Sequence, residues 1–329
     1  MNKELKITML GASGVGKTTL LTSMYEQFRT TIEQANLYLQ PDIETEAILN
    51  KYLGQLKSLT QEFRADERNK GGIRGTAATA GPESLPSYTF DLGRKEKTSL
   101  RLLFRDYPGG YISEREIAGR RFVQKLLREC AAVIIAIDTP AIMELNGRWH
   151  LFRNRPDEIL SLFKTAYQNL NEPRLVIFAP VKCETYVKDE ASADHLVWRI
   201  KNEYASLLEF LQEPSRADKV AVVTTPVQTV GCVVFWKIVV ENFNIPRFYF
   251  RKTSFDAEYS PQDGEQLLRY LLRFLLKVYL QDRRWPWLDM VRQFLNPDAE
   301  LKQAVELFAK GCKHTGGFSI LQGHHLLNI

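Results

Sequence analysis

The chain has 329 residues, 44% of them hydrophobic and 11% aromatic, which is enough to bury a core in one large domain or in one domain with an appendage. Its 44 basic and 39 acidic residues are mixed along the chain and give a net charge of +5, so charge alone does not point to nucleic acid. The most apolar segment, 267–280, is interrupted by Arg269, Arg273 and Lys277, unlike a membrane-spanning helix. We therefore expect a soluble protein.

The start of the chain and the cysteines suggest a compartment. Residues 1–5 lead directly into a strand-like segment and lack the features of a signal peptide. The four cysteines stand far apart, without a Cys-x-x-Cys pair or a histidine at metal-ligand spacing: Cys130, Cys183, Cys232 and Cys312. We expect buried, reduced thiols and a cytoplasmic location.

The N-terminal third predicts a strand, a glycine loop and helices. Residues 5–10 are short and β-rich, and 17–28 have helical spacing of apolar residues. Residues 43–63 repeat apolar positions at intervals of three and four, which predicts an inserted helical element over about 30–70. The glycine- and alanine-rich stretch 70–86 has no periodicity, and we expect a mobile loop there.

The middle of the chain predicts a sheet. Residues 88–92 and 99–104 form a hairpin pattern around a turn at 93–97. Three continuous apolar runs follow, typical of strands covered on both faces: 131–138, 175–180 and 220–225. The pattern predicts an α/β, doubly wound sheet of about six strands, mostly parallel, with the hairpin strand as its antiparallel edge.

The C-terminal part predicts helices at 264–282, 285–295 and 299–310, then a non-helical tail at 316–329. An added strand is expected at 248–251. We divide the chain into a main domain, 1–260, and a helical extension with its tail, 261–329.

The helix around 267–280 is apolar over more than one stripe, so we expect it to pack on two sides. In one interpretation it is the last helix of the sheet, covered by Trp285, Trp287 and Leu288. In the other, it docks a partner or a second copy together with apolar residues of the tail. Those tail residues are Phe318, Ile320, Leu321, Leu326 and Leu327.

Residues 11–18 read GASGVGKT, the eight-residue phosphate-loop pattern, between an expected strand and helix. The backbone N–H groups at the helix start can converge on phosphate oxygens. Lys17 would bridge the β- and γ-phosphates, and the Thr18 hydroxyl would bind magnesium. The expected nucleotide contacts in this loop are Gly11, Ser13, Gly14, Val15, Gly16, Lys17, Thr18 and Thr19.

A second motif, Asp106-Tyr107-Pro108-Gly109, ends the second strand of the expected hairpin. A carboxylate there can hold magnesium beside the phosphate loop, and Gly109 has the spacing to offer its N–H to the γ-phosphate. The alternative is an ordinary Pro-Gly turn.

With these two motifs, the chain resembles the Ras-like, translation-factor-related class of P-loop GTPases over about residues 5 to 230. The motif Asp106-Tyr107-Pro108-Gly109 is similar to that of a bacterial branch of this class, which includes the YcjX-like proteins. The resemblance implies Mg²⁺ and GTP as ligands, a conformational switch, and a protein effector or self-association. It also implies a first-switch threonine that closes on the metal, for which Thr79 and Thr76 are the candidates.

The class recognises guanine with Asn-Lys-x-Asp, and the matching segment here is Val181-Lys182-Cys183-Glu184. Glu184 can accept from the guanine edge, and Lys182 can lie over the base. The asparagine is replaced by Val181, so adenine remains an alternative to guanine. The segment 225–227 falls where the class places its last base loop, which implies base contacts from Pro226 and Val227.

Gly110 stands where fast members of the class have glutamine, so we expect slow hydrolysis. Arg115, Arg120 or Arg121 could supply the missing charge, although surface positions are the simpler interpretation of a basic run that continues to Lys125 and Arg128. Three functions remain open: a GTP switch with slow turnover, an ATP-driven module, and a nucleotide-dependent assembly element with little hydrolysis.

Overall fold

The computed structural model describes residues 4–32, 36–62, 85–94, 100–113, 115–241, 245–281, 285, 287–296 and 299–329. Eight strands form one sheet: β1 (Leu5–Leu10), β2 (Tyr38–Pro41), β3 (Ser87–Gly93), β4 (Leu100–Arg105), β5 (Ala132–Asp138), β6 (Arg174–Val181), β7 (Val220–Thr224) and β10 (Ser319–Gln322). The longer helices are α1 (Lys17–Ile32), α2 (Ile43–Glu62), α3 (Ile117–Glu129), α6 (Pro156–Ala166), α7 (Glu190–Glu203), α8 (Ala205–Gln212), α10 (Gln266–Tyr279), α11 (Leu288–Leu295) and α12 (Ala299–Lys310). Short α-helices are α4 (Thr139–Met143), α5 (His150–Asn154) and α9 (Pro214–Ala217).

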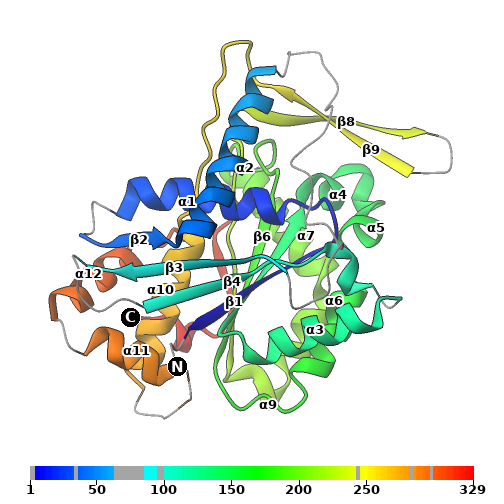
Figure 1. Cartoon of the computed structure of the whole chain (residues 1–329). Coiled ribbons are helices and arrows are strands. Elements are labelled where there is room, and N and C mark those ends of the chain that lie inside the picture. Colours follow the sequence, from blue (N-terminus) through cyan, green and yellow to red (C-terminus); the bar gives the residue numbers. More distant parts are fainter. Residues whose placement is uncertain are drawn as a thin grey trace.

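The sheet runs in the order β10-β7-β6-β5-β1-β4-β3-β2 (Figure 1). Its five central strands, β7, β6, β5, β1 and β4, are parallel to one another. The remaining three pair antiparallel at its two ends, with β3 and β2 beside β4 and β10 beside β7. The carboxyl ends of the parallel strands therefore meet at one edge, where ligands bind in folds of this type.

The mostly parallel α/β sheet is confirmed, and the six strands predicted from sequence are all present. The sheet nevertheless has eight strands, because both of its ends are extended. Strand β2, which lies inside the segment predicted to be only helical, pairs with β3, so the hairpin strand is not the edge. Strand β10 forms in the segment predicted to be a tail. Both added strands are four residues long, too short to show a clear sequence period.

Helices cover both faces of the sheet (Figure 1). Buried residues of α1, α10, α11 and α12 pack on one face, and buried residues of α3, α6, α7 and α8 pack on the other. The central strands are consequently buried throughout, as in β5 and β6, where every residue is buried. This two-sided burial explains their continuous apolar sequences.

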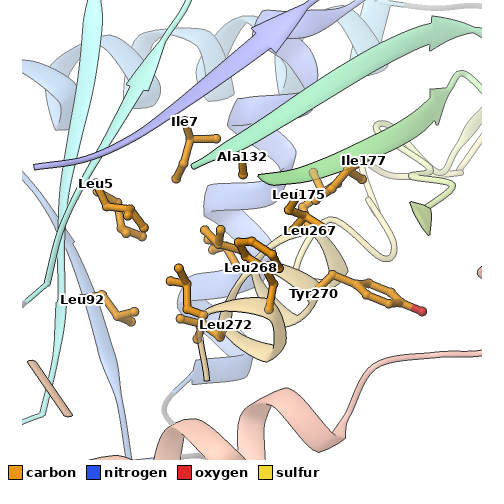
Figure 2. Close-up of a cluster of buried hydrophobic side chains, with 14 of the residues drawn as sticks. Leu5, Ile7, Leu92, Ala132, Leu175, Ile177, Leu267, Leu268, Tyr270 and Leu272 are labelled. Carbon is orange, nitrogen blue, oxygen red and sulfur yellow. The ribbon is translucent and has the colours of Figure 1, made fainter. Parts of the chain in front are cut away.

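Helix α10 lies directly under the sheet. Figure 2 shows Leu267, Leu268 and Leu272 of this helix against Leu5, Ile7 and Leu175 of the strands. Its opposite side packs on α11 and α12, and Trp287 stacks on Phe274 at 6.1 Å between ring centroids. The interpretation of 267–280 as a helix of the sheet, covered on two sides, is confirmed.

The tail is part of the same core. Phe318, Leu326 and Leu327 are at most 4% exposed, and Ile320 and Leu321 are half-buried. The hypothesis that these residues offer a docking surface is wrong for this conformation, because the sheet and α10 already cover the three buried ones. The four cysteines are buried and free.

A second sheet contains only β8 (Val233–Glu241) and β9 (Ile245–Lys252), paired antiparallel as a hairpin (Figure 1). The strand expected at 248–251 lies within β9, and β8 before it was not predicted from the sequence. Within the part of the chain that the structure describes, no helix has the length and apolarity needed to cross a bilayer.

Candidate functional site

The phosphate loop joins β1 to α1 at the carboxyl edge of the sheet. Gly14 and Gly16 have φ of +77° and +121°, a region that other residues rarely adopt, so glycine is required at both positions. Helix α1 begins at Lys17, and the N–H groups of its first turn therefore face the loop. This is an anion-binding arrangement formed by backbone alone.

Lys17 is 7% exposed and folds over this loop. Its Nζ donates to the carbonyl oxygens of Gly11 at 2.9 Å and Ala12 at 3.3 Å. Burial lowers the pKa of the Lys17 ammonium, while the nearby Asp106 carboxylate acts in the opposite direction. A phosphate anion in the loop would favour the charged form in the same way as Asp106 does.

Thr18 and Asp106 meet at the edge of the sheet, one from the first turn of α1 and the other from the end of β4. The Thr18 hydroxyl donates to Asp106 Oδ2 at 3.2 Å, and Asp106 Oδ1 accepts from the N–H of Tyr107 at 2.9 Å. Both side chains are buried. A hydroxyl and a carboxylate held together beside a phosphate loop are oxygen donors of the kind that Mg²⁺ prefers, so the residues fit the ion.

Gly109 lies against the phosphate loop. A Cβ at this position would fall 2.0 Å from the backbone N of Ser13 and 2.2 Å from the backbone C of Ala12, so only glycine allows the approach. Gly110, in contrast, has open space around its missing side chain. The two motifs that the sequence places far apart are thus in direct contact.

The segment after β6 also reaches the phosphate loop. Val181 is buried beside Gly16, and Lys182 has a left-handed φ of 56° that turns its side chain back over the loop. Lys182 Nζ donates to the Gly14 carbonyl at 3.2 Å and to Asp138 Oδ2 at 2.6 Å. Lys182 therefore links the segment after β6 to the phosphate loop, although Val181 stands in place of the expected asparagine.

Asp138 is a site residue that the sequence analysis missed. It ends β5 and is completely buried, and its Oδ2 also contacts Arg153 Nη2 at 3.4 Å. Asn154 contacts the main chain of Asp138. Asn154 Oδ1 accepts from Asp138 N at 2.7 Å, and Asn154 Nδ2 donates to Asp138 O at 3.2 Å. Asp138 Oδ1 has no hydrogen-bond partner among the described residues. The available signal was its place at the end of a buried strand, the same place that Asp106 occupies on β4.

Glu184 is 7% exposed and accepts from the backbone N–H groups of Val230 and Gly231, both at 3.2 Å. Burial raises the pKa of the carboxyl, and these N–H groups partly oppose the rise. Val227 is in the core, with its N–H donating to Pro180 O at 2.9 Å, and Pro226 packs beside Gly317. In this conformation the Glu184 carboxylate holds the loop after β7.

Among the arginine candidates, Arg120 has a structural role. Its guanidinium donates to Ile112 O at 3.0 Å and to Ser161 Oγ at 2.5 Å, joining α3 to the segment after Gly109 and to α6. Lys125 is 4.0 Å from Glu129 on the same helix, the distance of a weak surface pair. The first-switch candidates Thr76 and Thr79 lie outside the described residues.

No protein-family model and no curated protein match this sequence. Among solved structures, the chain is similar to the signal recognition particle receptor SRb-GTP/SRX complex from Chaetomium thermophilum, with 14% identity, 70% of this chain and 93% of that chain covered, and a TM-score of 0.39. It is similar to the S. cerevisiae Ski7 GTPase-like domain bound to GTP, with 15% identity, 68% of this chain and 43% of that chain covered, and a TM-score of 0.37. The chemistry of the site depends on the contacts around Lys17, Thr18 and Asp106.

Proposed function

We propose that this protein is a magnesium-dependent GTP-binding switch with slow intrinsic hydrolysis. The observation that carries the proposal is the contact between Thr18 and Asp106 at the mouth of a phosphate loop that Lys17 crosses. The motif at Asp106–Gly109 further favours a relationship to the YcjX-like branch of P-loop GTPases.

Each group of residues in the site has its own chemical role. The N–H groups at the start of α1 and the Lys17 ammonium bind the phosphates, while Thr18 and Asp106 would hold Mg²⁺, which neutralises phosphate charge when bound. Gly109 is close enough to the loop to respond to a γ-phosphate, and Thr79 is the proposed residue of the first switch. Because Gly110 has no side chain to orient a water molecule, hydrolysis is slow without a partner.

The base site favours guanine through Lys182 and Glu184. The Val230 and Gly231 N–H groups present to Glu184 the same pair of donors that the guanine edge presents, so the carboxylate can exchange one pair for the other. ATP is the second candidate, because the carboxylate already has these two partners without any base. The third is an assembly element that holds the triphosphate and scarcely hydrolyses it.

The deciding experiment is to release the nucleotide carried by the purified protein and identify it by chromatography. Titrations with GTP and ATP, with and without Mg²⁺, then give the preference and the metal dependence. Tighter ATP binding would reject the guanine proposal. Turnover measured over a range of protein concentrations separates a slow hydrolase from an assembly element.

Replacing Glu184 with glutamine is expected to weaken GTP binding by about ten- to a hundredfold and to change ATP binding little, since one charge-assisted contact to guanine is lost. Isothermal titration with both nucleotides measures the effect, and Glu190→Gln on the exposed start of α7 is the control. An equal loss for both nucleotides would mean that Glu184 only supports the loop after β7.

Replacing Asp138 with asparagine is expected to weaken nucleotide binding by about tenfold, because the charged contact with Lys182 at 2.6 Å is lost while the main-chain contacts to Asn154 remain. The dissociation constant for GTP measures it, with the exposed Asp194→Asn as control. Unchanged affinity in a variant of unchanged melting temperature would show that Asp138 does not position Lys182.

A further inference from the structure

The β8–β9 hairpin stands apart from the main sheet, at the top of Figure 1. Strand β8 has nine residues and β9 has eight, yet most of their described side chains are half-exposed or exposed. Trp236 and Val240 are 40% and 42% exposed. A two-stranded sheet rarely persists without something that covers a face, and an exposed apolar patch of this kind marks an interaction surface.

The body of the protein packs against one face of the hairpin. Phe235 lies 6.4 Å from the ring of Tyr186, Lys182 Nζ lies 5.9 Å from the Phe250 ring, and Arg153 lies 5.1 Å from the Phe248 ring. These aromatic residues of the hairpin share one face, because Phe235 is paired with Phe250 and Ile238 with Phe248. The hairpin is therefore fixed beside the phosphate loop, and the strands extend outward from it.

The outer half of the hairpin carries aliphatic residues on both faces, with the exposed Arg247 opposite Val239. The pairing places Ile238 and Val240 on the face of Phe248, and it places Val239 on the opposite face. Pro246, opposite Val240, extends the apolar set at this end.

Cations and amphipathic rings lie among and behind these aliphatic residues, on the second face. Lys237 is paired with Tyr249, and its Nζ lies 4.2 Å from the ring of Trp236. Arg247 and Arg251 flank Tyr249 at alternate positions and are exposed. Aliphatic residues bordered by Trp, Tyr, Lys and Arg are the combination found where proteins meet the headgroup layer of a membrane.

From this combination, we infer that the outer half of the β8–β9 hairpin binds the surface of an anionic lipid bilayer. The positive side chains are complementary to anionic headgroups, and Ile238, Val239 and Val240 reach the boundary of the acyl chains. Depth is limited because the outer backbone edges of the two strands have no strand partner among the described residues. The hairpin is thus an interfacial anchor and does not cross the membrane.

The test is co-sedimentation of the full chain with vesicles of phosphatidylcholine alone or mixed with phosphatidylglycerol. We expect binding to the mixed vesicles that weakens as salt is added. Lys237→Gln with Arg247→Gln should weaken that binding by about thirtyfold, at the usual contribution of about 1 kcal/mol for each cation near the surface. Lys201→Gln with Arg121→Gln is the matched control, since both residues are exposed on helices and the net charge changes equally.

A second variant tests the apolar part. Val239→Ser with Val240→Ser should weaken binding to the mixed vesicles, whereas Leu307→Ser on the exposed side of α12 should not. The inference is overturned if the native chain does not sediment with mixed vesicles, or if the hairpin variants bind as tightly as their controls. It is also overturned if the hairpin binds a single-stranded oligonucleotide, measured by fluorescence anisotropy, and no vesicle.

Discussion

The variant Lys17→Ala is expected to lose nearly all triphosphate binding, a decrease of at least about a hundredfold, while it keeps its fold. The Nζ of Lys17 contacts two backbone carbonyls of the phosphate loop and belongs to neither hydrophobic cluster. Its removal takes away the loop's own lysine charge and leaves the packing of α1 and β1 unchanged. The cost in stability should be that of two lost hydrogen bonds to carbonyls, about 1–3 kcal/mol.

Binding of a fluorescent triphosphate, together with thermal unfolding, measures both parts of this prediction. Lys252→Ala is a close control, because Lys252 is also buried and also donates to a carbonyl, that of Phe255 at 3.0 Å. We expect the control to lose stability and keep its affinity for the nucleotide. A folded Lys17→Ala protein that binds triphosphate as tightly as the native chain would refute the phosphate-loop assignment.

Removal of residues 284–329 is expected to leave a chain that does not fold. The deletion removes α11, α12 and β10, which exposes the outer side of α10 and leaves β7 as an edge strand. It also removes direct core contacts, such as the edge-to-face pair of Phe28 and Phe308 at 5.3 Å. The hydrogen bond from Thr224 Oγ1 to Gly317 O at 2.8 Å is lost with it.

The readouts are solubility, circular dichroism and nucleotide binding of the truncated chain. A single substitution tests the same packing in a folded protein. Phe308→Ala should lower the free energy of unfolding by about 3–5 kcal/mol. The control Leu307→Ala, at an exposed neighbouring position, should have little effect. A well-folded truncated protein with triphosphate affinity within about threefold of the native value would contradict this and support the proposed division into 1–260 and 261–329.

The sequence by itself determined the central strands, the longer helices and the two phosphate-site motifs. Continuous apolar runs can only be strands covered on two faces or buried helices, and their length separates the two. The roles of Gly14 and Gly16 in the phosphate loop could be predicted because their backbone conformation excludes other residues. These properties are local, so neighbouring residues are enough to define them.

Tertiary structure alone decided the rest. Strands β2 and β10 exist because β3 and β7 offer them free backbone groups, and a four-residue segment carries no period that would show this. Asp138 became a site residue only when β5 and β6 paired in register, which sets it opposite Val181 and next to Lys182. Glu184, which was predicted to accept hydrogen bonds from a guanine edge, accepts them from the N–H groups of Val230 and Gly231. In each case the partner lies far along the chain, and a buried polar group must take whichever partner folding brings to it.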